Sequence, residues 1–260
     1  MLALVRRSLP AVVPALLALA LSAATARADG DIVLTPKQVA PRTWYFQGEA
    51  GMASALNKGF MSNAGFVVTT DGVVVFDALG TPALGRAMLA AIRRVTPQPV
   101  KRVIVSHYHA DHFYGLAAFK EAGAEIWAHR RAREYLASDQ AGDRLAQRRV
   151  DLFPWVDERT RIVAPDIWLD GDTDFRLGGV TFRVLYAESA HSPEDLMLYA
   201  VDERVLFVGD LVFAGRVPFV GTGMRGSVLA LLAASNSKPA RTTDAWRMSS
   251  AFRWSKVSAL

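Results

Sequence analysis

The segment from His107 to His112 constrains this chain most, because His107, His109, Asp111 and His112 can all ligate a metal ion. Imidazole and carboxylate groups are the usual ligands of catalytic zinc, which keeps one coordination position open for water. Burying so many polar groups without partners would be costly, so we favour a metal site over a surface cluster of histidines. In an extended stretch, alternate side chains point to the same side. We therefore expect His107 and His109 to face one metal, while Asp111 and His112 turn toward a second.

The surroundings of this cluster are typical of an α/β active site. Residues 103–106 read as a short buried strand, and residues 115–120 read as the start of a helix. The cluster therefore lies where a strand ends and a helix begins. His191 and Asp210 also follow predicted strands. A His or Asp in a turn is often just a cap or turn-former, but beside such a cluster we take both as candidate ligands.

The rest of the chain predicts hairpins of strands with helices inserted between them. Asp71-Gly72 is a hairpin turn signal, and Thr81-Pro82 suits the start of a helix. We expect strands at residues 31–34, 43–47, 65–69, 73–76, 103–106, 124–128, 173–177, 180–186, 196–201 and 205–208. Helices are expected at residues 81–94, 115–120 and 130–149. This order favours an α/β fold of two packed sheets flanked by helices.

The first 28 residues have the pattern of a secretory signal peptide. Arg6 and Arg7 precede an apolar run at residues 9–21, and a small-x-small site ends at Ala28. The alternative is a membrane anchor, but the run is short for a span of roughly 20 residues. We expect cleavage after Ala28, and a periplasmic or secreted protein with no remaining membrane segment.

Composition narrows the partners. The chain has no cysteine, so an exported form has no disulfides and every metal ligand must be nitrogen or oxygen. The net charge of +5 is concentrated at the ends, since residues 1–28 carry three arginines and no acid, and residues 222–260 carry six basic residues and one acid. The body is left at −3, which gives no reason to expect nucleic acid. We expect a small-molecule substrate.

The pattern His-x-His-x-Asp-His after a hydrophobic strand resembles the metallo-β-lactamase superfamily, which implies an αββα sandwich. The resemblance also implies a ligand set of three histidines for the first metal, an Asp and a His for the second, and a bridging Asp: His107, His109 and His191, then Asp111 and His112, then Asp210. The Asp at position 210 argues against the β-lactamase subclasses that have a Cys there. The implied cofactor is zinc, as one or two ions.

The implied chemistry is hydrolysis. Two cations close together lower the pKa of a water between them and supply a nucleophile near neutral pH. Asp111 is the expected catalytic residue, orienting the nucleophile and shuttling its proton. Asp77, just after a strand, is either a turn residue or a support for a ligand histidine. His129 is either a site residue or, as we favour, a solvated histidine at a helix start.

A closer resemblance covers residues 41–221. Segments 59–66, 152–158 and 190–195 look like those of exported zinc metallohydrolases linked to quinoprotein relay systems. This implies a hydrolase acting on an ester, thioester or amide-type bond, in the context of a quinoprotein dehydrogenase pathway. Two alternatives stay open: a metal-binding but catalytically impaired remnant, and a mononuclear iron sulfur dioxygenase.

The end of the chain departs from the superfamily pattern. We divide the chain into a signal peptide (residues 1–28), a metallo-β-lactamase-like domain (29–221) and an atypical tail (222–260). The superfamily supplies a late histidine to the second metal, whereas this chain has no His after His191. The abrupt change near residue 221 indicates a frameshift or a divergent end, so we expect an incomplete C-terminal part and a weakly held second metal. A genuine pair of helices in the tail is the alternative.

Overall fold

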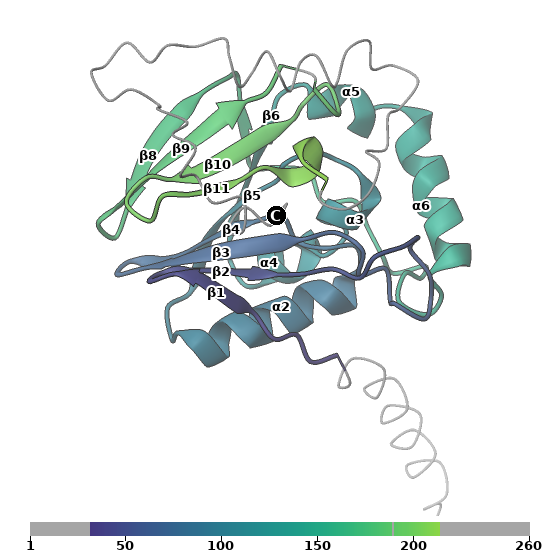
Figure 1. Cartoon of the computed structure of the whole chain (residues 1–260). Helices are drawn as coiled ribbons and strands as arrows, with labels where there is room; N and C mark the ends of the chain where they lie inside the picture. Colours follow the sequence, from purple (N-terminus) through teal and green to yellow (C-terminus); the bar gives the residue numbers. More distant parts are fainter. Residues whose placement is uncertain (1–31, 189, 214–260) are drawn as a thin grey trace, which may run out of the picture. The chain divides into compact units, whose positions relative to one another are not determined.

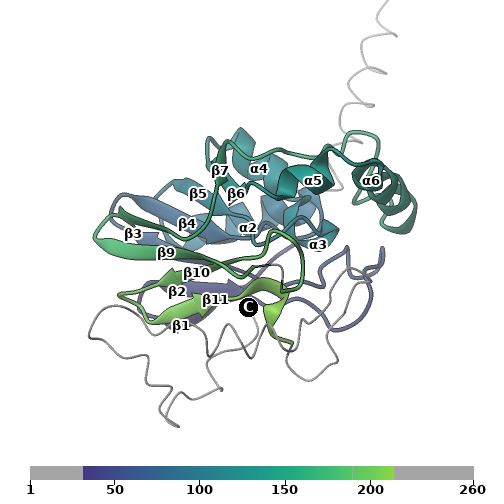
Figure 2. The same cartoon turned by 90° about the horizontal axis from the view of Figure 1, so that it is seen from above.

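A computed structural model of the chain describes residues 32–188 and 190–213 (Figure 1). The predicted signal peptide and the predicted tail lie outside these residues. The described part forms two sheets stacked face to face, with helices against the larger one (Figures 1 and 2). None of the described helices has the length and apolar character needed to cross a bilayer.

The larger sheet has seven strands that follow each other in chain order. Its first four strands pair antiparallel, and β4 to β7 pair parallel. Parallel strands end on the same edge of a sheet, so the segments after β4, β5 and β6 meet there. The strands are β1 (Lys37–Ala40), β2 (Thr43–Phe46), β3 (Ala64–Thr69), β4 (Gly72–Phe76), β5 (Val100–Ile104), β6 (Glu125–His129) and β7 (Ile167–Leu169).

The smaller sheet is an antiparallel meander in the order β11-β10-β9-β8. Its strands are β8 (Thr173–Leu177), β9 (Val180–Tyr186), β10 (Leu196–Ala200) and β11 (Val205–Phe207), and the short 3-10 helix η1 (Gly209–Leu211) follows. Alternate residues of β9 and β10 are fully buried, as expected for strands with one face on a core.

The main core lies between the two sheets. Val74 and Phe76 of β4 pack against residues of the smaller sheet, among them Phe182 and Phe207. The rings of Phe76 and Phe207 are stacked with centroids 5.6 Å apart. Phe76 directly precedes Asp77, and Phe207 lies three positions before Asp210. The core therefore fixes two strand ends that carry candidate site residues.

Helix α2 (Pro82–Val95) covers the face of the larger sheet that is turned away from the smaller one (Figure 1). Thr81 caps its start, because Thr81 Oγ1 accepts from Leu84 N at 3.2 Å, and Pro82 is its first residue as predicted. At Gly115 a Cβ would lie 1.9 Å from the carbonyl oxygen of Ala78, so only glycine allows this approach. This contact holds the chain after the metal motif against the end of β4.

The remaining helices are short or peripheral. They are α3 (Ala110–Phe113), α4 (Leu116–Glu121), α5 (Ala132–Leu136) and α6 (Asp139–Asp151). The predicted helix at residues 130–149 is therefore two helices, separated at residues 137–138. The predicted strand at residues 31–34 is wrong, because the first strand is β1 at residues 37–40. The α/β sandwich is confirmed, and the expectation of an incomplete C-terminal part concerns residues outside the described ones.

Candidate metal centre

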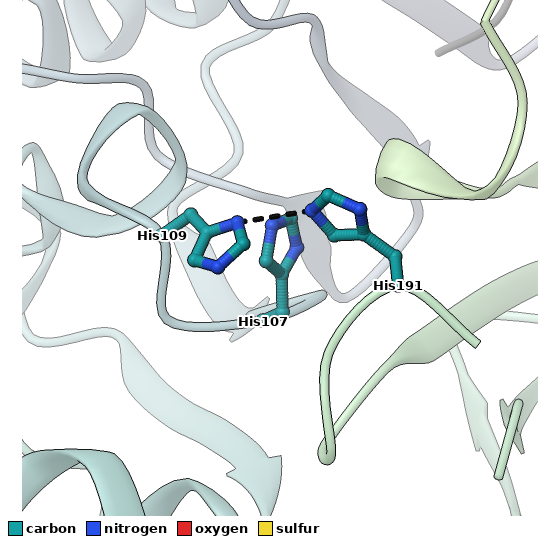
Figure 3. A group of neighbouring side chains, drawn as sticks. All are labelled: His107, His109 and His191. Carbon is teal, nitrogen blue, oxygen red and sulfur yellow. Dashed lines mark hydrogen bonds between the residues drawn. The ribbon is translucent and has the colours of Figure 1, made fainter. Parts of the chain in front are cut away.

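Three imidazoles meet at the edge where the parallel strands end. His107 and His109 follow β5, and His191 lies in the loop between β9 and β10. Their rings face one another (Figure 3), with His107 4.5 Å from His109 and 4.8 Å from His191 between centroids. His191 Nε2 lies 2.9 Å from His109 Nδ1. One nitrogen from each ring falls within 4.8 Å of the others, a spacing at which all three can ligate one ion.

The ring nitrogens of His107 have different surroundings. Its Nδ1 lies 2.9 Å from Ser106 Oγ, which orients the ring. Its Nε2 is buried and has no hydrogen-bond partner among the described residues. A buried nitrogen without a partner costs free energy unless something else binds it. This nitrogen fits a metal ligand whose outer nitrogen is held by a hydrogen bond, the usual arrangement for ligating histidines.

A second group shares His107 and adds His112 and Asp210. His112 Nε2 lies 3.2 Å from Asp210 Oδ1 and 3.5 Å from Asp111 Oδ2. It is buried and not aligned for a hydrogen bond with any group in residues 32–188 or 190–213. The one open nitrogen of His107 has a single lone pair and can serve one metal at a time. A second metal beside the three-histidine site would therefore use His112 and Asp210, with Asp111 next to them, and not His107.

Asp77 supports the second group through its contact with His112. Its side chain is fully buried, and Asp77 Oδ2 lies 2.8 Å from His112 Nδ1. Ser106 donates to the same carboxylate from its backbone N at 2.7 Å and from Oγ at 2.8 Å. Asp77 holds a backbone φ of 61°, a left-handed conformation that is uncommon outside glycine. Of the two interpretations of Asp77, this contact favours support of a histidine over a turn residue.

Asp210 owes its position to the residue before it. Gly209 has a φ of 55°, and a Cβ there would lie 2.9 Å from Ser106 Cβ. Only glycine lets the chain turn this tightly against the strand end at Ser106. The turn starts η1 and aims the Asp210 carboxylate at His112, with Asp210 Oδ2 3.7 Å from His191 Nε2. Asp210 thus belongs to the second group and also approaches the first through His191.

The electrostatic surroundings of the two groups differ. Burial, together with the neighbouring imidazoles, holds the pKa of His107 well below its usual value and lowers that of His109 to about 4. Metal ligation needs neutral imidazoles, so these rings are in the required form. Burial alone would lower the pKa of His112, but nearby carboxylates, Asp210 foremost, outweigh it and raise that pKa well above the usual value. The carboxylates that favour a positive charge on His112 would also favour a metal cation beside it.

The structure changes how the motif is read. His107 and His109 point to one site as predicted, but Asp111 and His112 are directed by a helical turn and not by strand alternation. Helix α3 starts directly after His109, with His109 in the N-cap position. Asp111 lies beside His112 but outside the two three-residue groups, and its side chain is 18% exposed.

His129 lies at the end of β6 but outside both groups. The expectation of a solvated His129 is wrong, because its side chain is buried and its ring stacks on Tyr186 with centroids 3.8 Å apart. Stacking on an aromatic ring compensates for part of the lost hydration.

Sequence reasoning missed three residues that hold the site: Ser106, Glu194 and Asp195. Ser106 orients His107 and Asp77 as described above. Asp195 Oδ2 accepts from the backbone N of His191 and from that of Ser192, the latter at 2.6 Å. A Ser-x-x-Asp run directly after a candidate ligand is the one local signal that points to such a turn.

Comparison with protein families gives one match that covers most of the chain. A family model described as the metallo-beta-lactamase superfamily matches residues 57–248. That range includes the whole cluster of candidate ligands.

Curated relatives match at low identity. The 2,4-dinitroanisole O-demethylase subunit alpha of Nocardioides sp. (strain JS1661) is 27% identical over 145 residues, which is 55% of this chain and 39% of that protein. The linear primary-alkylsulfatase of Pseudomonas sp. (strain ATCC 19151) is 23% identical over 183 residues, 60% of this chain and 34% of that one. Metallo-beta-lactamase IND-1 of Chryseobacterium indologenes is 23% identical over 155 residues, 60% of this chain and 56% of its own length. The chain thus spans a third to just over half of these relatives.

Solved structures share the fold. A metallo-beta-lactamase from Pontibacter korlensis has a TM-score of 0.55 and 20% identity over 71% of this chain and 74% of its own. A stereoselective inverting sec-alkylsulfatase from Pseudomonas sp. has a TM-score of 0.53 and 21% identity over 68% of this chain and 31% of its own. At such identities, the likeness establishes the fold alone.

Proposed function

Because this chain belongs to the metallo-beta-lactamase superfamily, we propose that it is a zinc-dependent hydrolase that cleaves an ester, thioester or amide-type bond of a small molecule. One observation carries the proposal: His107, His109 and His191 converge, and the buried Nε2 of His107 has no hydrogen-bond partner in the described part of the chain. These three histidines would hold the first zinc. His112, Asp210 and Asp111 offer the groups for a second.

Zinc bound here would supply a water of lowered pKa as nucleophile and would polarise the bond to be cleaved. Asp111 is the residue to receive the proton of this water, because its carboxylate is partly exposed and lies 3.5 Å from His112 Nε2. Ser62 Oγ donates to the backbone carbonyl of Asp111 and so fixes the start of the turn. His112 is fixed by Asp77 from the opposite side. Asp111 and His112 are thus held in place by residues from different parts of the chain.

The substrate class is open, because the relatives named above carry out different reactions. Their names cover sulfate esters, an aryl ether and lactams. A test uses purified protein with a thioester, an aryl ester, an alkyl sulfate and a β-lactam reporter. We expect hydrolysis of at least one reporter that stops on chelation and returns with zinc. Asp111→Ala is the matched variant, since it should keep the first zinc and lose turnover. Hydrolysis that persists in the presence of the chelator would contradict the proposal.

A second candidate rests on the three-histidine group alone. If only the three-histidine group fills, the site holds one ion, which suits a mononuclear iron sulfur dioxygenase. Metal analysis separates the two, because the dioxygenase contains one iron per chain and consumes oxygen with a persulfide substrate. A protein that binds zinc tightly but cleaves none of the four reporters would favour the impaired remnant.

Export and partners remain part of the proposal. We propose that residues 1–28 direct the protein to the periplasm or outside the cell, and that it serves a quinoprotein dehydrogenase pathway. The family match continues to residue 248, beyond the change in composition near residue 221. The proposed frameshift is tested by sequencing the encoding locus after the codon for residue 221. An intact Gly-His-Gly in another frame would support it, and its absence would contradict it.

A further inference from the structure

The loop that carries His191 is held together by the carboxylate of Asp195, a residue of the same loop. Asp195, which is 3% exposed, accepts from the backbone N of His191 and of Ser192 through Oδ2. Ser192 Oγ donates to Asp195 Oδ1 at 2.8 Å. These bonds fix the backbone from which His191 projects. They leave open how this loop is placed against the segment that carries His107 and His109.

Glu194 supplies that placement. Its Oε1 accepts from the backbone N of Tyr108 at 3.1 Å, and Tyr108 lies between the two ligand-type histidines of the motif. A backbone bond from Leu196 N to Ser106 O, 2.9 Å long, joins the same two segments one residue before His107. His107 is thus bracketed by two links from the His191 loop. Of these two links, the one through Glu194 is made by a side chain and the other by the backbone alone.

The burial of Glu194 argues for a specific role. Its side chain is 4% exposed, and among the described residues it forms no salt bridge. Buried carboxylates without a cationic partner are rare because they lose their hydration. Burial also raises the pKa of Glu194. An apolar residue would pack here at lower cost, but it could not accept the Tyr108 N–H.

We propose that Glu194 is a positioning residue that sets the separation between His191 and the His107–His109 pair, so that the three-histidine site has its geometry before a metal binds. The inference rests on the proposed metal site but not on any reaction. In the described part of the chain, the hydrogen bond from Glu194 to the motif segment goes to the backbone of Tyr108 and not to a ligand side chain. It acts through the backbone of Tyr108, as residues that orient metal ligands commonly do.

The test compares variants by zinc affinity and by the visible spectrum of the cobalt-substituted protein. Glu194→Ala removes the acceptor, and we expect zinc to bind about 10- to 100-fold more weakly with an altered cobalt spectrum. Glu194→Gln keeps an amide oxygen that can accept from Tyr108 N, so it should restore both. Glu194→Asp is one methylene too short to reach, and should behave like the Ala variant.

Asp166→Ala is the matched control, because Asp166 Oδ2 also accepts from a backbone N, that of Ile126 in β6 at 2.9 Å. It should lower thermal stability and leave the spectrum unchanged. If Glu194→Ala does not fold, the Asp variant decides. A Glu194→Ala or Glu194→Asp protein with wild-type affinity and spectrum would overturn the inference alone. Wild-type protein that binds neither zinc nor cobalt would overturn the proposed function together with it.

Discussion

Substitution of Asp77 by Asn tests the idea that one buried carboxylate prepares His112 to bind a metal. Asp77 Oδ2 faces His112 Nδ1 at 2.8 Å, so the carboxylate requires a hydrogen on Nδ1 and leaves Nε2 with a lone pair. Asn tolerates the left-handed backbone at this position, where φ is 61°, so the change adds little backbone strain.

The amide, however, cannot serve both neighbours of the carboxylate. Its oxygen is needed opposite Ser106 N, which donates to Asp77 Oδ1 at 2.7 Å. The NH2 group then faces His112 Nδ1, which must accept, and the ring hydrogen moves to Nε2. A protonated Nε2 cannot ligate. Loss of such an orienting partner typically costs 10- to 100-fold in metal affinity, or about 1.4 to 2.8 kcal/mol.

The assay is calorimetric zinc titration of metal-free protein. In Asp77→Asn, the second binding event should weaken by that factor while the first, on three other histidines, changes much less. Asp202→Asn serves as the control, because Asp202 also accepts from a backbone N, that of Thr181 at 2.6 Å, and lies in the turn between β10 and β11, at the other end of these strands from His191 and Asp210. Unchanged affinity for the second zinc in Asp77→Asn would refute the tautomer argument.

Three further outcomes are expected. His109→Ala should lose most bound zinc and the stability linked to it, which is about 4 kcal/mol at a thousandfold excess over Kd, and calorimetric melting with and without zinc measures this. Acidification from about pH 8 to about pH 6 should release the second metal before the first, because the raised pKa of His112 lets a proton compete while the lowered pKa values of His107 and His109 do not; metal content after dialysis at each pH would show the reverse order if this is wrong. The mature protein should begin at Asp29, and an intact mass that includes Arg6 and Arg7 would contradict signal cleavage.

The fold was predictable where apolar runs are long and bounded by turn residues. The bounds of β8 and β9 coincide with the prediction, and α2 begins one residue after its predicted cap. Short elements were not predicted. β7 has three residues, too few to show a period, and two of the four residues of β1 are polar, while the apolar residues from Ile32 to Leu34 form no strand.

The ligand cluster was predictable because its residues lie close together and their chemistry is rare in a core. Asp77 was a hypothesis from its place at a strand end. Glu194 was not predictable, because its partner Tyr108 lies 86 positions away in the chain. His112 lies in the second group as expected, but for a different reason: the chain turns into α3 directly after His109, so strand alternation stops there.

Zinc binding by the three histidines is the central claim, and calorimetric titration of wild type beside His191→Ala tests it most directly. We predict one tight zinc per chain in wild type, followed by a second, weaker event, because His107 serves the first metal and no histidine follows His191 to complete the second site. His191→Ala should lose the tight event. Two equally tight zincs in wild type would contradict the unequal sites, and a tight event that survives in His191→Ala would contradict the assignment itself.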